Sequence, residues 1–130
     1  MMKIYLTNLK EVVENFNGEH YWELNTNNED YIYFKSYTNS IYAKDIGFEI
    51  DIINKAEDEI EFIFSVLEEV LSYRNGFDVN YWINFYCEEN VSGAPTDIDD
   101  ITDDIKDEEK AINELYDNLY KYYTTTLRKL

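Results

Sequence analysis

The sequence predicts an α+β fold in which an antiparallel sheet of about five to six strands is packed by one short and two long amphipathic helices. Several segments alternate apolar and polar residues with a period of two, which is typical of half-buried strands. Two other segments carry apolar residues at helical spacing. The chain has 130 residues, of which 45% are hydrophobic, so we expect a single acidic domain, residues 1–130, that buries its own core.

The N-terminal segment predicts a strand and then a short helix. Lys3–Leu6 is a short apolar run of strand type. Thr7 follows as the predicted cap of a helix that Gly18 ends. The apolar positions of this helix have the spacing i, i+3, i+4, i+7 and are Leu9, Val12, Val13 and Phe16.

Most of the predicted strands lie between residues 20 and 53. The segments His20–Asn25 and Tyr31–Ser36 flank a polar five-residue turn, so we expect them to pair as a hairpin. Two further strands, Asn39–Lys44 and Phe48–Ile53, extend the meander. Between Phe77 and Cys87 apolar residues occupy every second position, which predicts a long strand with one core-facing side.

Two long helices complete the expected fold. Asn54 is the predicted cap of the first, which runs to about Tyr73. Its apolar stripe is Ala56, Ile60, Ile63, Phe64, Leu67, Val70 and Leu71. The segment Glu88–Ile101 is expected to be a loop, after which Thr102 caps a last helix that runs towards Leu130.

Charge is the most unusual property of the sequence. Twenty-eight Asp and Glu stand against eleven Lys and Arg, which gives a net charge of −17 at pH 7. Direct binding of nucleic acid is disfavoured, because phosphate contacts need Lys and Arg. A compact domain of this length is about 36 Å across, and a DNA duplex that long carries about 21 phosphates. The protein therefore approaches the charge density of the nucleic acid itself.

The carboxylates gather in two places, and we interpret both as candidate surfaces for a basic partner. One is the outer face of the helix after Asn54, and the other is the stretch from Asp97 into the first turns of the last helix. The candidate partner-binding residues are Glu57, Glu61, Glu68, Glu69, Asp97, Asp99, Asp100, Asp103, Asp104, Asp107, Glu108 and Glu109. The alternative is that these charges are only solvated.

No catalytic or metal-binding motif is apparent. With Asp97 as position 1 of a calcium loop, Ile101 stands at position 5 and Thr102 replaces the glycine of position 6, so an EF-hand is rejected. His20, the only histidine, and Cys87, the only cysteine, are both interpreted as structural. The four glycines lie too far apart for a phosphate-binding loop. We expect no enzyme activity, no cofactor and no metal.

The cellular setting is inferred from what the sequence lacks. The N-terminus has no apolar core of a signal peptide. No run approaches the roughly 18 apolar residues of a membrane helix. One cysteine allows no intrachain disulfide, which agrees with a reducing compartment. The expected location is the cytoplasm of a bacterial host cell, without membrane contact.

A resemblance adds a functional expectation. Residues 3–9 (Lys-Ile-Tyr-Leu-Thr-Asn-Leu), Asn17-Gly18 and Trp22-Glu23-Leu24 resemble the start of ArdA-type antirestriction proteins, which are acidic DNA mimics of mobile elements. The composition is also similar to that of phage anti-CRISPR proteins. The resemblance implies a non-catalytic inhibitor of a host defence nuclease, whose basic nucleic-acid-binding surface, alone or in its complex, is the partner. The alternatives are an immunity or antitoxin protein that neutralises a basic toxin, and a phage structural or regulatory protein.

Overall fold

The computed structural model describes residues 2–15, 20–27, 30–37, 47–51, 56–89 and 98–127. Within these ranges the chain is an α+β fold with a three-stranded antiparallel sheet and four α-helices, two of them long. The predicted class is confirmed, but the expected number of strands is wrong. The elements run in the order α1 (Met2–Glu14), β1 (Tyr21–Asn25), β2 (Tyr31–Tyr37), β3 (Phe48–Asp51), α2 (Glu59–Gly76), α3 (Val79–Glu89) and α4 (Ile98–Tyr122), and a one-turn π-helix, Tyr123–Leu127, follows α4.

The three strands form a meander in the order β1-β2-β3. Leu24 lies opposite Phe34, and Phe34 lies opposite Phe48, so rows of side chains cross the whole sheet. The predicted hairpin is confirmed as β1 and β2. Of the strand predicted over Phe48–Ile53, the structure has Phe48–Asp51 as β3. The strand predicted over Asn39–Lys44 lies outside the described residues.

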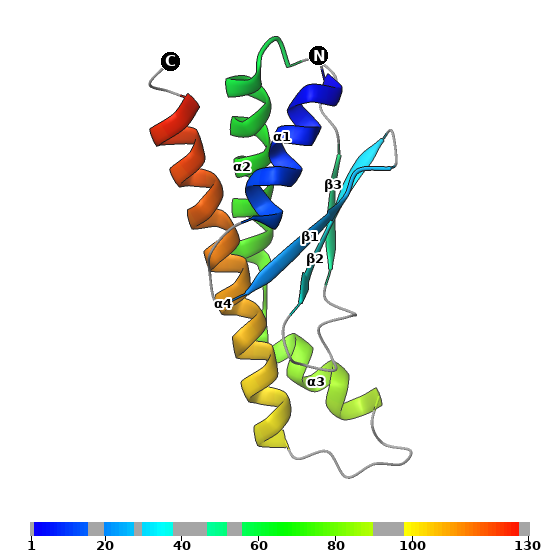
Figure 1. Cartoon of the computed structure of the whole chain (residues 1–130). Coiled ribbons are helices and arrows are strands. Elements are labelled where there is room, and N and C mark those ends of the chain that lie inside the picture. The colour runs from blue at the N-terminus through cyan, green and yellow to red at the C-terminus, as the bar shows by residue number, and fades with distance from the viewer. Residues whose placement is uncertain are drawn as a thin grey trace.

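One face of the sheet is packed against helices. The side chains of β1 and β3 alternate between buried and exposed along each strand, as expected for a sheet with one covered face. Helices α1, α2 and α4 lie on the covered side, while α3 lies beside the first turns of α4 (Figure 1). We call the other side the open sheet face. It carries side chains that are exposed or half-buried, namely Tyr21, Glu23, Asn25, Tyr31, Tyr33, Lys35, Glu49 and Asp51.

The core lies between the sheet and these three helices. Trp22 is 1% exposed, and its indole Nε1 donates a hydrogen bond to the Ala111 carbonyl of α4 at 3.0 Å. The ring of Phe48 stacks on Phe34 at 4.8 Å and on Tyr73 of α2 at 4.1 Å between ring centres. Aromatic side chains of this size dominate the energetics of a small core, so β3 is fixed to both the sheet and α2.

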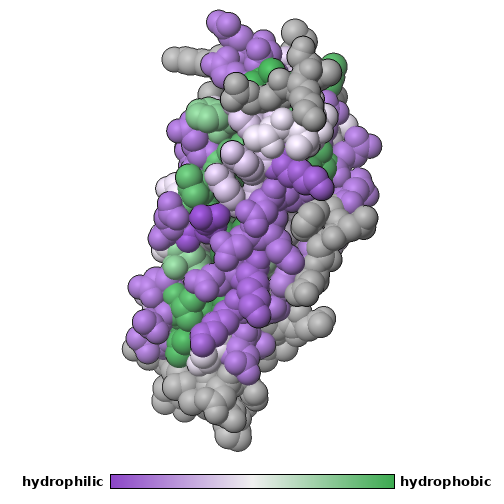
Figure 2. Space-filling view, turned by 90° about the vertical axis from the view of Figure 1, so that its left-hand side faces the viewer, coloured by the Kyte–Doolittle hydropathy of each residue, from purple (hydrophilic) through white to green (hydrophobic). Residues whose placement is uncertain are grey.

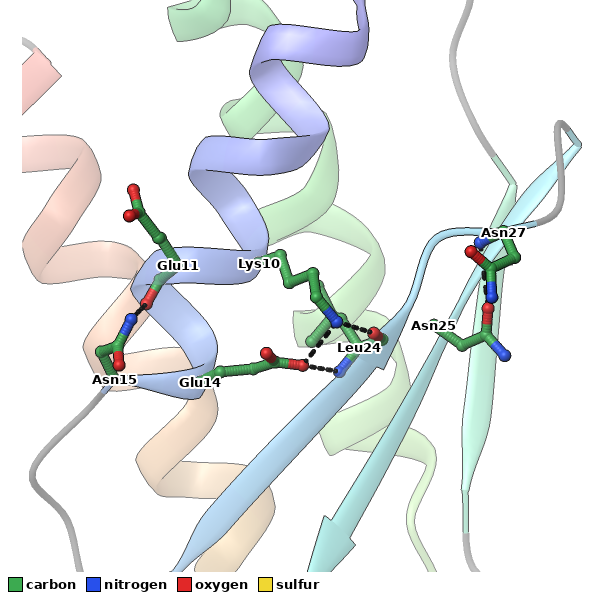
Figure 3. A network of polar contacts seen from close by, with 7 residues as sticks. All are labelled: Lys10, Glu11, Glu14, Asn15, Leu24, Asn25 and Asn27. Atoms are coloured by element: carbon green, nitrogen blue, oxygen red, sulfur yellow. Dashed lines mark hydrogen bonds and ion pairs between the residues drawn. The ribbon is translucent and has the colours of Figure 1, made fainter.

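The free edge of β1 is occupied by side chains from α1 (Figure 3). The Leu24 N–H donates to Glu14 Oε2 at 3.0 Å, and the Leu24 carbonyl accepts from Lys10 Nζ at 3.0 Å. Lys10 and Glu14 also form an ion pair at 3.0 Å. We call these contacts the edge clamp. Unpaired groups on an edge strand invite pairing with another chain, and the clamp blocks this at Leu24.

The strand predicted over Lys3–Leu6 is wrong, because these residues belong to α1. The run is too short for its apolar residues to distinguish a strand from a helix. In the structure Tyr5 packs against the core one turn before the fully buried Leu9, so the helix begins ahead of the predicted cap at Thr7. The predicted helix residues Phe16 and Gly18 lie outside the described residues.

The strand predicted over Phe77–Cys87 is also wrong, because this segment forms α3. Its apolar residues fit both the two-residue period of a strand and the 3.6-residue period of a helix. The Asp78 side chain accepts the Tyr81 N–H at 3.1 Å, which is N-cap geometry. Apolar side chains with the helical spacing i, i+3, i+4 then pack around the buried Ile105 of α4, and they are Val79, Trp82 and Ile83.

Both long helices differ from their predicted limits. Helix α2 begins after the cap Asp58 and ends at Gly76, whereas the predicted cap Asn54 lies outside the described residues. Helix α4 begins at Ile98, so the predicted cap Thr102 lies inside it. Carboxylates are favoured near a helix N-terminus, and the acidic stretch therefore extends the helix instead of forming a loop. The α-helix ends at Tyr122 before the π-helix, and residues 128–130 are outside the described ranges.

Candidate partner-binding surface

The outer side of α2 presents exposed carboxylates without an interspersed basic residue. Between residues 56 and 76 the only basic residue is Arg74. Its guanidinium lies 4.8 Å from the centre of the Tyr116 ring of α4, on the side where the two helices meet. We call the exposed carboxylates the α2 acidic face, and they are Glu57, Asp58, Glu61, Glu68 and Glu69.

Two members of the α2 acidic face also hold the start of the helix. Asp58 Oδ1 accepts the Glu61 N–H at 2.8 Å, and Glu61 Oε2 accepts the Glu57 N–H at 2.9 Å. The first contact is an N-cap that satisfies a backbone donor of the first turn, and the second is a return contact like that of a capping box, made to the residue before the cap. The carboxylates of Glu57, Glu68 and Glu69 take no part in this cap.

An exposed apolar stripe borders the α2 acidic face. Phe64 is 47% exposed and Ile60 is 36% exposed. Helical spacing places Glu61 and Glu68 one turn on either side of Phe64. The Phe64 ring touches Tyr123 of the π-helix, with 5.9 Å between ring centres. Protein interfaces commonly have an aromatic centre within a polar rim, and this stretch of α2 has that composition.

The third strand carries exposed carboxylates of its own. Asp51 of β3 and Ser65 of α2 line one small hollow between the two elements. Asp51 and Glu49 are both exposed on the open sheet face. They therefore add negative charge to that face of the sheet.

The outer face of α4 carries charges of both signs. Hydrophilic side chains cover most of the side of the molecule seen in Figure 2. From residue 102 onwards, the exposed charged residues of α4 are Asp103, Glu109 and Asp117 with Lys106, Lys110 and Lys121. Over this part of the helix, the exposed carboxylates therefore lie among lysines.

Several carboxylates of α4 turn towards the sheet, and His20 lies among them. His20 is buried, at 6% exposed. Its Nε2 lies 2.8 Å from Asp107 Oδ1, and its Nδ1 lies 2.5 Å from Glu114 Oε2. Burial lowers the pKa of His20, but the hydrogen bonds to Asp107 and Glu114, together with their charges, outweigh it and raise the pKa above 6.5. The imidazole thus joins the start of β1 to α4.

Glu108 is an interior residue. It is 0% exposed, and its Oε1 accepts a hydrogen bond from the Ser36 hydroxyl of β2. Burial, followed by the negative charge of Glu108, raises the pKa of the Tyr73 phenol. The carboxylate of Glu108 therefore sits in the core between β2, α2 and α4, and it is removed from any surface that a partner touches.

The structure divides the candidate residues into five groups. Exposed side chains are those of Glu57, just before α2, of Glu61, Glu68 and Glu69 in α2, and of Asp103 and Glu109 in α4. Asp104 and Asp107 are half-buried and Glu108 is buried. Asp99 and Asp100 belong to the first turn of α4. Asp97 lies outside the described residues.

Phe64 and Ile60 were missed as surface residues, since the predicted stripe placed both in the core. The buried residues of α2 are Phe62, Ile63, Val66, Leu67 and Val70. This helix has more apolar residues than one buried stripe needs, so a second stripe remains exposed. The excess of apolar positions was the signal that the sequence offered.

The described part of the chain lacks a metal-ligand cluster and a membrane-length apolar helix. Among these residues there is no group of three or more His, Cys, Asp or Glu side chains able to hold a metal ion. None of the described helices has the length and apolar character needed to cross a membrane. Comparison of the whole chain with protein-family models, curated proteins and solved structures gives no match.

Proposed function

We propose that the protein acts by binding, as a non-catalytic inhibitor that covers a basic nucleic-acid-binding surface of a host defence nuclease. The observation that supports this most is the α2 acidic face, where five exposed carboxylates adjoin the exposed Phe64 with no lysine or arginine among them. The choice of a defence nuclease rests on the sequence resemblance of residues 3–9, 17–18 and 22–24 to antirestriction proteins.

The spacing of the carboxylates favours mimicry of a single nucleic-acid strand. Helix α2 advances about 15 Å from Glu59 to Glu69 at a helical rise of 1.5 Å per residue, and Glu57 and Asp58 precede it and lengthen the row. Five carboxylates over this length give one negative charge per roughly 4 Å, and one strand of DNA carries one per about 3.4 Å. A groove whose Lys and Arg residues hold one strand is therefore the partner surface that fits best.

The carboxylates and the aromatic ring contribute to binding in different ways. Exposed ion pairs each contribute little to affinity, but complementary charge raises the association rate and selects basic partners. Desolvated aromatic side chains supply most of the binding energy in many interfaces. Phe64, at 47% exposed, is the residue of this surface with the largest apolar area to bury.

The test is capture followed by competition. The immobilised protein is exposed to host lysate freed of nucleic acid, and bound proteins are challenged with single-stranded DNA, guide-length RNA or duplex DNA at low and high salt. We expect a basic nuclease that nucleic acid displaces, with weaker binding at high salt. A partner that is not basic, or one that nucleic acid leaves bound, contradicts the proposal.

A further inference from the structure

The open sheet face contains a hollow that the α2 acidic face does not include. It has a volume of about 550 Å³, and the described residues that line it are Asn25, Asn27, Tyr31, Tyr33 and Glu49. Pockets for small ligands measure about 300–1,000 Å³. The hollow is therefore large enough for a long side chain with part of its backbone.

The strand register explains why these residues meet. Tyr33 lies opposite Asn25 on one side and opposite Glu49 on the other. Tyr31 is two positions earlier on β2, so it points to the same face of the sheet. Two phenol rings are thus bordered by an amide and a carboxylate. Lys35, two positions after Tyr33, lies opposite Glu23 and is not among the lining residues.

Gly47 leaves room for the Tyr33 ring. A Cβ atom at Gly47 would lie 2.0 Å from the Tyr33 hydroxyl oxygen, which is far inside van der Waals contact. A side chain at residue 47 would therefore displace the ring from this position.

The lining favours a planar cation. The Glu49 carboxylate, the amide oxygens and the phenol oxygens can all accept hydrogen bonds, and the described lining contains no Lys or Arg. The net charge of −17 attracts cations and repels anions. A guanidinium has only donors, stacks on aromatic rings and binds carboxylates in a bidentate manner. An ammonium is more strongly hydrated and uses the ring faces less well.

We propose that this hollow binds the guanidinium of an arginine side chain, stacked on Tyr33 or Tyr31 and paired with Glu49. The assignment of that arginine to the basic partner rests on the proposed function. Strand β3 carries Glu49 and packs against α2, so a partner that spans this edge of the sheet can contact both. The arginine site itself is a property of the open sheet face.

The experiment measures binding of N-acetyl-arginine amide by NMR, with N-acetyl-citrulline amide as its neutral isostere and N-acetyl-lysine amide as a second cation. We expect the arginine probe to shift resonances of Tyr31, Tyr33 and Glu49 with the highest affinity. Glu49→Gln should weaken it at least tenfold, as expected when a charge-assisted contact is lost. Tyr33→Leu and Gly47→Ala should also weaken it, whereas Tyr33→Phe keeps the ring and most of the affinity.

Glu109→Gln on α4 is the matched control, because it removes one exposed negative charge away from the hollow. The proposal is overturned if Glu109→Gln weakens arginine binding as much as Glu49→Gln does. Citrulline binding as well as arginine, or a neutral monosaccharide shifting the same resonances more strongly, also overturns it.

A triple variant of the α2 acidic face distinguishes the arginine site from the proposed function. Glu57→Lys, Glu68→Lys and Glu69→Lys together reverse the α2 acidic face while sparing its cap. This variant should lose the captured partner and still bind N-acetyl-arginine amide within about twofold of the wild type. If the arginine probe binds wild type and variant alike but no basic partner is captured, only the proposed function fails. If a basic partner is captured but the arginine probe does not bind, only the arginine site fails.

Discussion

His20 illustrates how a single residue joins two elements that are distant in sequence. It lies between Asp107 and Glu114 of α4, both within hydrogen-bonding distance of its ring. Its pKa is raised above 6.5 in the folded protein. The contact therefore adds to the free energy of unfolding fully below about pH 6.5, and this contribution is lost as pH rises through the folded-state pKa.

Replacement of His20 should therefore have a pH-dependent effect on stability. Replacing His20 with Gln should lower the free energy of unfolding more at about pH 5.5 than at about pH 9, as measured by urea denaturation of both proteins. His20 is the only histidine, so its ring proton signal in NMR gives the pKa directly. A pKa at or below 6.5, or a wild-type advantage that grows with pH, contradicts the account.

The same substitution should destabilise the protein far more at Glu108 than at Glu68. Glu108 is 0% exposed and accepts a hydrogen bond from Ser36, so Glu108→Lys places an unmatched cation in the core and should cost about 3 kcal/mol or more. Glu68 is exposed, and Glu68→Lys should change stability by about 0.5 kcal/mol or less. Equal losses in urea denaturation would show that Glu108 is a surface residue.

At the scale of elements, the edge clamp makes β1 depend on α1. Glu14→Ala should remove the acceptor of the Leu24 N–H and cost about 1–3 kcal/mol, with faster hydrogen exchange at that amide. Glu11→Ala on the same helix is the control, because Glu11 is exposed. If both variants leave the exchange of Leu24 unchanged, the clamp contributes nothing to the edge.

Helix α3 packs around Ile105, which forms a cluster separate from the main core. Ile105→Ala should leave a cavity and cost about 2–4 kcal/mol. Hydrogen exchange should show that α3 loses protection first, while β2 and α2 keep theirs. Loss of protection in all three elements together would mean that the two clusters form one cooperative unit.

The sequence predicts those elements whose signals are local. The hairpin of β1 and β2 combines strict alternation with a polar turn, and both act within a few residues. Between Phe77 and Cys87 the same alternation misleads, because the Asp78 cap and the contact with Ile105 decide in favour of a helix. Secondary structure there depends on a partner far along the chain.

Local sequence likewise predicts one part of the candidate site and not the other. The exposure of Glu57 and Glu68 follows from the amphipathic pattern of α2. No local pattern shows that Asp107 faces His20 while Glu109 faces solvent, since this depends on how α4 meets the sheet. The hollow beside Tyr33 requires the register of three strands, which the sequence alone does not supply.

At the scale of the whole molecule, folding distributes the negative charge unevenly over the surface. The chain carries −17, but the exposed charges of α4 from residue 102 onwards are of both signs and Glu108 is internal. Concentrated negative charge with an adjacent aromatic ring remains on α2, and Glu49 and Asp51 of β3 are exposed on the open sheet face. The central claim is therefore that this side of the molecule, and not net charge alone, selects the partner.

Two variants of equal net charge test that claim most directly. The first carries Glu57→Lys, Glu68→Lys and Glu69→Lys on α2, and the second carries Asp103→Lys, Glu109→Lys and Asp117→Lys on α4. Three reversals add six charges in each, which takes −17 to −11. The measurement is the dissociation constant of each variant for the captured partner at one ionic strength. We expect the α2 variant to bind at least tenfold more weakly than the α4 variant; equal affinities would contradict the account.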